Sequence, residues 1–281
     1  MKKSLTGEAL PAKIVTYLFI FALIVVAIIP AIWMLSTSIK GVSEIFTIPP
    51  KIFPDSPTFE NYITVLHQSK MYSAFFNSVF ITTTVVVLTL FLSILAGYGL
   101  ARYRFRGSKV IQMAVLFGQM MPAVVIIIPL YMSFTRLKLI NTHFSLIFAD
   151  LALTIPMGVV MFSSFFRGIP KELEEAAKID GTTGLGALFR VILPISTPGI
   201  TAVAIYTFIN AWEEFLFALN FSTSQKTVTL PLAIHLFASE FVVDWGATMS
   251  AATVVALPVL LLFLLCNKYF VQGLSDGSVK G

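Results

Sequence analysis

Long apolar runs alternate with short polar segments along the whole chain. Six of these runs reach the roughly 20 residues that a helix needs to cross a bilayer. They cover residues 14–36, 74–98, 110–132, 146–166, 199–219 and 247–270. The pattern predicts an all-α membrane protein with six transmembrane helices. Four prolines inside these runs are expected to kink their helices, namely Pro122, Pro129, Pro156 and Pro258.

The distribution of positive charge predicts how these helices are oriented. With the N-terminus inside, 13 of the 19 Lys and Arg residues fall on the inner side of the membrane and six on the outer side. Cytoplasmic segments of membrane proteins carry such an excess. Both termini are therefore expected in the cytoplasm, and topology explains the net charge of +5 without a nucleic-acid partner.

Composition excludes a soluble domain. Hydrophobic residues make up 57% of the 281 residues, charged residues only 12%, and the mean hydropathy is +0.89. The first apolar run is too long for the core of a signal peptide, and we expect it to stay in the protein. Cys266 is the single cysteine and the three histidines lie far apart, so we expect no disulfide within the chain and no metal site.

Two loops carry features of their own. Prolines interrupt the long outer segment 37–73, in which residues 59–67 are expected to form a short amphipathic helix. A loop of this length is either functional or a cap over the helix ends. The inner loop 101–109 alternates arginine with aromatic residues, which is typical of an anchor to anionic headgroups.

Polar residues inside the predicted helices are informative because a charge in hydrocarbon costs several kcal/mol unless it faces a bundle interior or a wet cavity. The candidates for lining a transport pathway interrupt the fifth run: Asn210, Trp212, Glu213 and Glu214. Alternatively, the two carboxylates lie at the interface and the asparagine joins neighbouring helices. Asp150, about one turn inside the fourth run, is expected to reach toward the interface.

The segment 171–194 is the one long charged stretch between the apolar runs. Three glutamates suit the positive end of a first helix, and Gly181 is expected to end that helix. Thr182 or Thr183 then caps a second helix, which stops near Pro194. The first helix has a shallow apolar face, formed by Leu173, Ala176, Ala177 and Ile179, with Glu174 and Lys178 paired on its wetter side. The segment either fits a partner protein or lies on the membrane as an amphipathic loop.

The sequence contains no recognisable motif for an energy source that could drive transport. It has no Gly-x-x-x-x-Gly-Lys-Ser/Thr phosphate loop, no credible pair of nucleophile and base, and no paired-histidine metal motif. An enzyme is therefore not expected. Energy must come from an ion gradient, as in a secondary transporter of small polar solutes, or from a partner docked on the cytoplasmic face.

The cytoplasmic segment resembles the coupling loop of permease subunits in ATP-binding-cassette importers. The family motif is Glu-Ala-Ala, three residues, Gly, nine residues, then Ile-x-Leu-Pro. Here it stands as Glu175-Ala176-Ala177, Gly181 and Val191-Ile192-Leu193-Pro194, with valine in place of isoleucine. Asp180-Gly181, the run 210–215 and the C-terminal residues 273–281 resemble the carbohydrate branch and its MalG-like subunit of maltose-type importers.

This resemblance implies a type I importer fold with a core at 72–270 that includes the coupling loop 167–198. Residues 1–71 would add the first transmembrane helix and the long external loop, and 271–281 a cytoplasmic tail. The coupling residues implied by position are Glu174, Glu175, Ala176, Ala177, Asp180, Gly181, Leu193 and Pro194. Further ATPase contacts implied for the tail are Ser275, Gly277 and Lys280.

The resemblance also implies partners and a location. They are a second permease subunit, two ATP-binding-cassette ATPase subunits, an external sugar-binding protein and membrane lipid. ATP and Mg would be bound by the ATPase subunits, and this chain would hold no cofactor. The expected location is the prokaryotic inner membrane, and the expected role is one half of the translocation pathway of a sugar importer.

Overall fold

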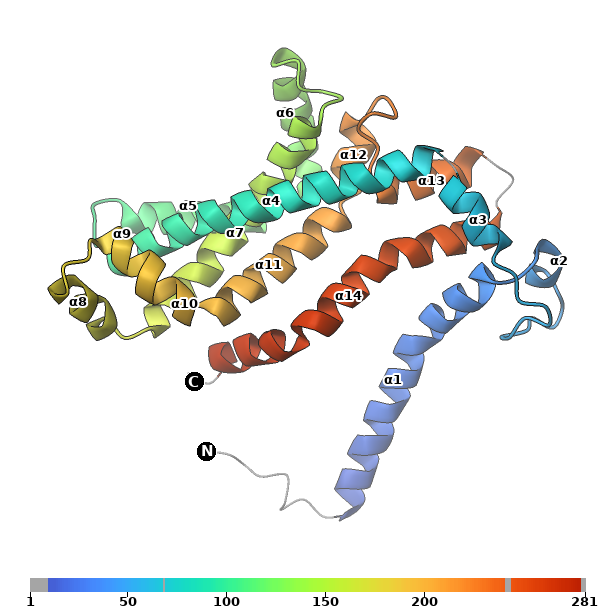
Figure 1. Ribbon diagram of the computed structural model, residues 1–281, viewed down its shortest axis with the longest axis horizontal. Coiled ribbons are helices and arrows are strands. Elements are labelled where there is room, and N and C mark those ends of the chain that lie inside the picture. Colours follow the sequence, from blue (N-terminus) through green and yellow to red (C-terminus); the bar gives the residue numbers. More distant parts are fainter. Residues whose placement is uncertain (1–9, 68, 241–243, 279–281) are drawn as a thin grey trace. The chain divides into compact units, whose positions relative to one another are not determined.

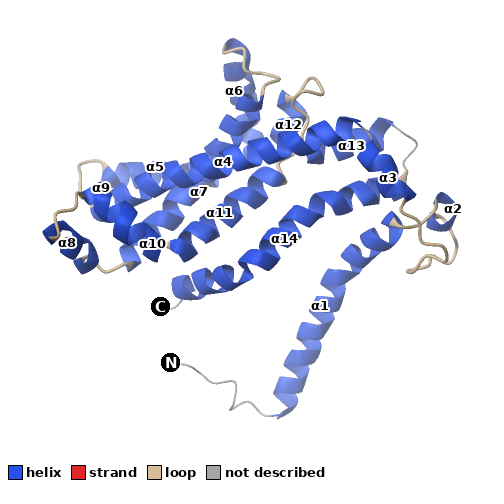
Figure 2. Cartoon of the chain, in the orientation of Figure 1, coloured by secondary structure: helices blue, strands red, loops and turns tan. Residues whose placement is uncertain are grey.

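The computed structural model describes residues 10–67, 69–240 and 244–278. Within these ranges every regular element is a helix and there is no strand (Figure 2). The prediction of an all-α protein is confirmed. In chain order the helices are α1 (Leu10–Ser38), α2 (Val42–Ile45), α3 (Glu60–His67), α4 (Ser69–Arg102), α5 (Ser108–Met120), α6 (Ala123–Arg136), α7 (His143–Gly168), α8 (Glu172–Ile179), α9 (Gly184–Ala187), α10 (Leu193–Ile195), α11 (Thr197–Trp212), α12 (Leu216–Phe221), α13 (Leu230–Glu240) and α14 (Trp245–Ser278).

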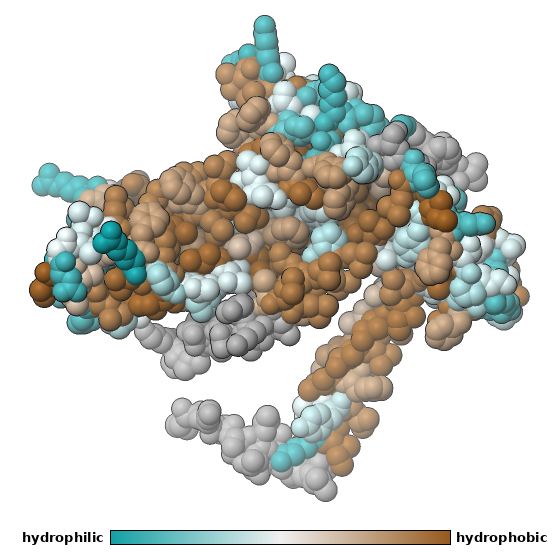
Figure 3. Space-filling model, in the orientation of Figure 1, coloured by the Kyte–Doolittle hydropathy of each residue, from teal (hydrophilic) through white to brown (hydrophobic). Residues whose placement is uncertain are grey.

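Four helices are long and apolar enough to cross a bilayer unbroken, namely α1, α4, α7 and α14. Two bent pairs raise the number of spans in the described residues to as many as six: α5 with α6 at 101°, and Gly184–Ile195 with α11 at 81°. Large apolar side chains such as Phe19 and Phe21 are exposed along α1, whose surface is mostly apolar in Figure 3. Such a surface suits contact with lipid.

The third predicted run is two helices joined by a sharp break at Met121 and Pro122. Met121 has an extended backbone, with ψ of 124°, as expected for a residue before proline. Pro122 has no N–H with which to continue the helical hydrogen bonds. The kink predicted at Pro122 is confirmed, and at 101° it divides the span rather than merely bending it.

The fifth predicted run also contains two helices, because α11 ends at Trp212 and α12 begins at Leu216. The carboxylate of Glu214 accepts hydrogen bonds from the backbone N–H groups of Phe217 and Ala218, at 2.5 and 3.0 Å. This side chain therefore satisfies donors at the start of α12 that have no partner within the helix.

The chain divides into two compact units, of which the first comprises residues 1–68 and 237–254. In this unit α3 forms at the predicted amphipathic stretch. Nδ2 of Asn61 in α3 donates to the backbone O of Ser38 and Lys40, at 2.9 and 2.8 Å. Oγ of Ser250 donates to the same Ser38 O at 3.0 Å. These bonds satisfy carbonyls at and just beyond the end of α1.

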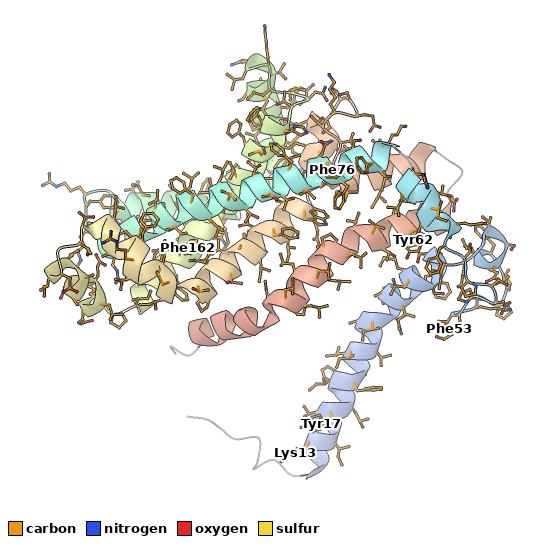
Figure 4. The ribbon with its side chains drawn as sticks, in the orientation of Figure 1. Lys13, Tyr17, Phe53, Tyr62, Phe76 and Phe162 are labelled. Carbon is orange, nitrogen blue, oxygen red and sulfur yellow. The ribbon has the colours of Figure 1, made fainter. Side chains whose placement is uncertain are left out.

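The second unit comprises residues 69–236 and 255–281, and in it α4, α7 and α11 pack side by side (Figure 1). Gly97 permits the close approach of α4 to α7, because a Cβ there would lie 2.7 Å from Cβ of Phe162. The hydroxyls of Thr89 and Thr154 hydrogen-bond across the same helix pair at 2.8 Å. Phe162, labelled in Figure 4, is fully buried among these helices.

Asparagines organise the end of the second unit that is predicted to face outward. Near the start of α4, Nδ2 of Asn77 donates to the backbone O of Lys226 and Val228, at 3.0 and 2.9 Å. Oδ1 of Asn141, in the turn between α6 and α7, accepts from the backbone N–H groups of Thr223 and Ser224, at 3.1 and 2.9 Å. The loop between α12 and α13 is thus held by side chains from two other parts of this unit.

Candidate functional site

The helix and glycine stop predicted for the cytoplasmic segment are confirmed by α8 and the turn that follows it. The backbone N–H of Gly181 donates to Lys178 O at 3.0 Å, and that of Thr182 donates to Ala177 O at 3.1 Å. This pair of bonds defines a Schellman turn. Gly181 has a φ of +86°, in the left-handed region that glycine adopts at little cost.

Thr183 caps the second helix of the segment. Its Oγ1 accepts a hydrogen bond from the backbone N–H of Gly186 at 3.1 Å. A π-helical turn, Leu188–Ile192, then leads into α10, which contains Leu193 and Pro194. Pro194 lies in the first turn of α10, where its missing N–H is tolerated. The helical path therefore bends at Ser196, slightly beyond the predicted end near Pro194.

Glu174 ties α8 to the end of α4. Its Oε1 accepts a hydrogen bond from the hydroxyl of Tyr98 at 2.7 Å, and its Oε2 lies 3.1 Å from Nε of Arg102 in an ion pair without hydrogen-bond alignment. The side chains of Glu174 and Arg102 are only 7% and 5% exposed. Because two of these groups are charged and all are shielded from water, each depends on its partners.

The same cluster reaches two further elements. Nη2 of Arg102 donates to the backbone O of Ile169, just after α7, at 3.0 Å. The hydroxyl of Tyr98 lies 3.2 Å from the backbone O of Gly184 at the start of α9. Tyr98, Arg102 and Glu174 together therefore connect α4, α7, α8 and α9, and we refer to these three residues as the Glu174 cluster.

Lys178 completes the surroundings of Glu174. Its Nζ lies 3.0 Å from Oε1 of Glu174, so the predicted pair one turn apart is confirmed. The expected orientation was wrong, however, because Glu174 faces inward and not toward water. Burial by itself raises the pKa of Glu174, but the hydrogen bonds from Tyr98 and Lys178 and the charges of Lys178 and Arg102 outweigh it and hold that pKa below its usual value.

The lowered pKa of Glu174 predicts how stability depends on pH. The folded protein binds this proton less readily than the unfolded chain, so the stabilisation is fully present above the ordinary Glu pKa of about 4.3 and is lost as the pH falls through the lowered pKa. We expect the gap in unfolding midpoint between the wild type and Glu174→Gln to be constant from about pH 5 to 8 and to narrow in acid. A gap that stays constant to below pH 4 would contradict this assignment, and Glu175→Gln is the control.

Three apolar residues lie on the outward side of α8, opposite to what an isolated amphipathic helix would favour. Leu173 is 41% exposed, Ile179 is 86% exposed, and Ala176 between them is also exposed, whereas Ala177 and Glu174 are buried. Four charged residues of the same segment are also exposed around these apolar side chains, namely Glu172, Glu175, Lys178 and Asp180. The next turn adds exposed Leu185. Exposed apolar side chains gathered on a polar loop are typical of a surface that is covered by another protein.

The structure separates the four pathway candidates. Asn210 and Glu213 are exposed, while Glu214 caps α12 and Trp212 is buried. The indole of Trp212 stacks on Phe208, and its Nε1 donates to the backbone O of Val255 in α14 at 3.0 Å. Two candidates are therefore accessible from outside the chain, and two have structural contacts within it.

Two other predicted positions can be placed. Asp150 is only 4% exposed and is one of the buried residues of α7. The expectation that its side chain reaches the membrane–water interface was therefore wrong. In the tail, residues 275 and 277 belong to the last turns of α14. Their side chains, and Lys280 altogether, lie outside the described residues.

Tyr98 and Arg102 were missed as site residues. They are four positions apart at the end of an apolar run, so they share one face of a helix. That spacing, with an acidic segment in the next inner loop, is the signal that could have indicated them. The interpretation of loop 101–109 as a headgroup anchor does not fit Arg102, whose side chain is only 5% exposed, whereas Arg104 and Arg106 are exposed.

Comparison with known proteins identifies the family. Residues 89–276 match the family model described as binding-protein-dependent transport system inner membrane component. The sulfoquinovosyl glycerol transport system permease SmoH of Agrobacterium fabrum is 36% identical, over 92% of this chain and 91% of its own length. The diacetylchitobiose uptake system permease DasC of Streptomyces coelicolor is 33% identical over the full length of both chains.

Solved structures agree with the fold. A subunit of a bacterial ABC transporter involved in the import of the acidic polysaccharide alginate matches with a TM-score of 0.81 and 21% identity, over 92% of this chain and 96% of that chain. The trehalose/maltose transport system permease MalG of Thermococcus litoralis is a further relative, 33% identical over 92% of this chain and 93% of its own. The fold is that of a type I importer permease, and the chain belongs to the family of binding-protein-dependent transport system inner membrane components.

Proposed function

We propose that this chain is the permease subunit of an ATP-driven sugar importer of a prokaryotic inner membrane, and that α8 couples it to a cytoplasmic ATPase. The observation that carries the coupling proposal is the apolar outward face of α8, held in place by the buried Glu174 cluster. Relatives named for trehalose, maltose and diacetylchitobiose transport support a sugar as the cargo.

In this proposal, the face formed by Leu173, Ala176 and Ile179 fits a groove of the ATPase, and Glu175 and Asp180 meet polar groups at its rim. Ala176 permits close approach because its side chain is small. The Schellman turn at Gly181 fixes the angle between α8 and the helical segment Gly184–Ile195, which joins α11 through the 81° bend at Ser196. Movement of α8 on closure of the ATPase would then be passed on to the membrane-spanning helices.

The remaining partners follow from the same proposal. A second permease subunit would complete the pathway, an external sugar-binding protein would deliver the cargo, and two ATPase subunits would bind ATP and Mg. Asn210 and Glu213 are the pathway residues that this chain leaves accessible. Ser275, Gly277 and Lys280 remain candidates for an additional contact between the C-terminal tail and the ATPases.

The docking face provides a direct test. Ile179→Glu places a charge in the proposed contact, at the end of α8, without touching the Glu174 cluster. We expect ATP-dependent sugar uptake, measured in proteoliposomes with the other subunits of its transport system, to fall at least tenfold. The amount of ATPase that co-purifies with this chain should fall by a similar factor. Because Ile179 is exposed, the unfolding midpoint of the isolated chain should stay unchanged.

The matched control is Gln225→Glu, which adds a charge at an exposed position of the outer loop. Normal uptake by Ile179→Glu would contradict the coupling role of α8. Uptake by the chain alone, driven by an ion gradient, would instead support a secondary transporter.

A further inference from the structure

A cavity lies between α4, α5 and α7 near the ends of these helices that are predicted to face the cytoplasm. Its volume is about 110 Å³, well above the roughly 10–15 Å³ that one water molecule needs. Its polar lining comes from Gln112, Ser163, Ser164 and Arg167, and apolar side chains such as Leu116 and Val160 line the rest. None of the lining residues is acidic, so the cavity offers hydrogen-bond donors and one positive charge.

The polar groups that line the cavity are largely unused within the protein. Arg167 forms no ion pair with any residue that the structure describes, and the hydroxyls of Ser163 and Ser164 form no hydrogen bond there. Ser163 is only 7% exposed, whereas Ser164 and Arg167 are exposed, and the amide of Gln112 donates to Oγ of Ser108 at 3.4 Å. The cavity is therefore open to the outside, and its hydroxyls and guanidinium can be reached by a molecule that supplies acceptors.

The lining changes character along one face of α7. Val160, Ser164 and Arg167 are spaced at intervals of four and three residues, so they lie above one another on the helix. The rise of 1.5 Å per residue separates Val160 from Arg167 by about 10 Å. The headgroup layer on each side of a bilayer is about 5–8 Å deep. From Val160 through Ser164 to Arg167, the side chains change from apolar to hydroxyl-bearing to cationic. This is the order of the acyl chain, ester and phosphate in a phospholipid.

The neighbouring loop strengthens the attraction for negative charge. It joins α4 to α5, both of which line the cavity, and it exposes Arg104, Arg106 and Lys109. Each basic side chain near the cytoplasmic surface contributes about 1 kcal/mol of attraction to an anionic membrane. The cavity thus has room for one segment of an acyl chain, and the positive charges around it favour an anionic headgroup.

We propose that this cavity binds one anionic phospholipid of the inner leaflet. Arg167 pairs with the phosphate, Ser163, Ser164 and the amide of Gln112 hydrogen-bond the phosphate and ester oxygens, and the first part of an acyl chain packs against Leu116 and Val160. The bound lipid fills the space between α5 and α7. This assignment does not depend on which cargo the chain transports.

The test uses the full-length chain in nanodiscs made from equal amounts of phosphatidylglycerol and phosphatidylcholine. After release into detergent, native mass spectrometry counts the lipids that stay bound. We expect the wild type to retain one phosphatidylglycerol, Arg167→Gln to retain at least fivefold less, and Ser164→Phe, which fills the cavity and keeps the charge, to lose it similarly. Arg190→Gln, an exposed basic residue that lines neither the cavity nor the neighbouring loop, is the control and should retain the lipid.

Three outcomes would overturn the proposal. The first is retention at the wild-type level by both Arg167→Gln and Ser164→Phe. The second is an equal loss in Arg190→Gln, which would show diffuse attraction to the membrane surface. The third is release of the lipid by millimolar inorganic phosphate, or saturable binding of phosphate without lipid, which would assign the cavity to a free anion. The unfolding midpoints of all variants are measured as well. If they are unchanged, a loss of bound lipid results from the change in the cavity and not from unfolding.

Discussion

Replacing Glu174 with glutamine should abolish sugar uptake while leaving membrane insertion intact. The amide can still accept the hydrogen bond from Tyr98, but Arg102 is left as a buried charge without a counter-charge. Removing one partner of a buried pair costs about 3–5 kcal/mol. At 1.4 kcal/mol per factor of ten this lowers the folding equilibrium constant more than a hundredfold, so we expect a lowered unfolding midpoint together with the loss of uptake.

The measurements that isolate this effect are uptake in proteoliposomes and thermal unfolding of the purified chain. Glu175→Gln is the matched control, because its side chain is the exposed neighbour and should leave unfolding unchanged. A double variant, Glu174→Met with Arg102→Met, replaces the pair by apolar side chains and should recover most of the lost stability. Equal unfolding midpoints for Glu174→Gln and Glu175→Gln would refute the structural role of the cluster.

Substituting valine for Gly97 should prevent α4 and α7 from packing. A Cβ at this position would lie 2.7 Å from Cβ of Phe162 and 3.0 Å from the backbone N of Ser163. The backbone cannot move aside without shifting a whole helix, so the cost is at or above the roughly 1–3 kcal/mol of ordinary overpacking. Because Tyr98 is the next residue, a shift of α4 also displaces its hydroxyl from Glu174.

The control for this prediction lies two residues further along the same helix. A Cβ at Gly99 meets nothing within 4 Å, and Gly99→Val carries the same helix propensity as Gly97→Val. We expect Gly97→Val to be recovered in low yield with a lowered unfolding midpoint and without uptake, while Gly99→Val behaves like the wild type. Comparable yield, midpoint and uptake for both variants would show that the close approach of α4 to α7 is dispensable.

The sequence predicts the helices of this protein better than their faces. Hydropathy alone indicates where α1, α4, α7 and α14 lie, since crossing a bilayer requires length and apolar composition and little else. Glycine and threonine chemistry likewise predicts the turn from Gly181 to Thr183. These features depend on residues that are close together in the chain.

The orientation of α8 could not be predicted in this way. An amphipathic pattern places Leu173 and Ile179 inside and Glu174 outside, as it would for a helix packed on an apolar core. The structure reverses this because Arg102, some 70 residues earlier, provides a counter-charge that no local pattern contains. The break at Glu213 is similar, since only the hydrogen bonds of Glu214 to α12 reveal that one apolar run holds two helices.

α4 forms hydrogen bonds near one end and an ion pair near the other. Asn77 holds the carbonyl groups of Lys226 and Val228 at the end predicted to face outward, and Arg102 holds Glu174 at the end predicted to face the cytoplasm. At 1.5 Å per residue these two side chains are about 38 Å apart along a single unbroken helix. A displacement of α4 therefore changes both sets of contacts together.

Thermodynamic linkage makes such a connection work equally in both directions. If binding at the outer loop favours one position of α4, it changes the affinity of the α8 face for its partner by some factor. Occupation of α8 by that partner must then change the affinity at the outer loop by the same factor. The effect of binding at the outer loop on the affinity of α8, and the effect of the α8 partner on the affinity of the outer loop, would thus measure the same coupling free energy. That free energy depends on the position of α4.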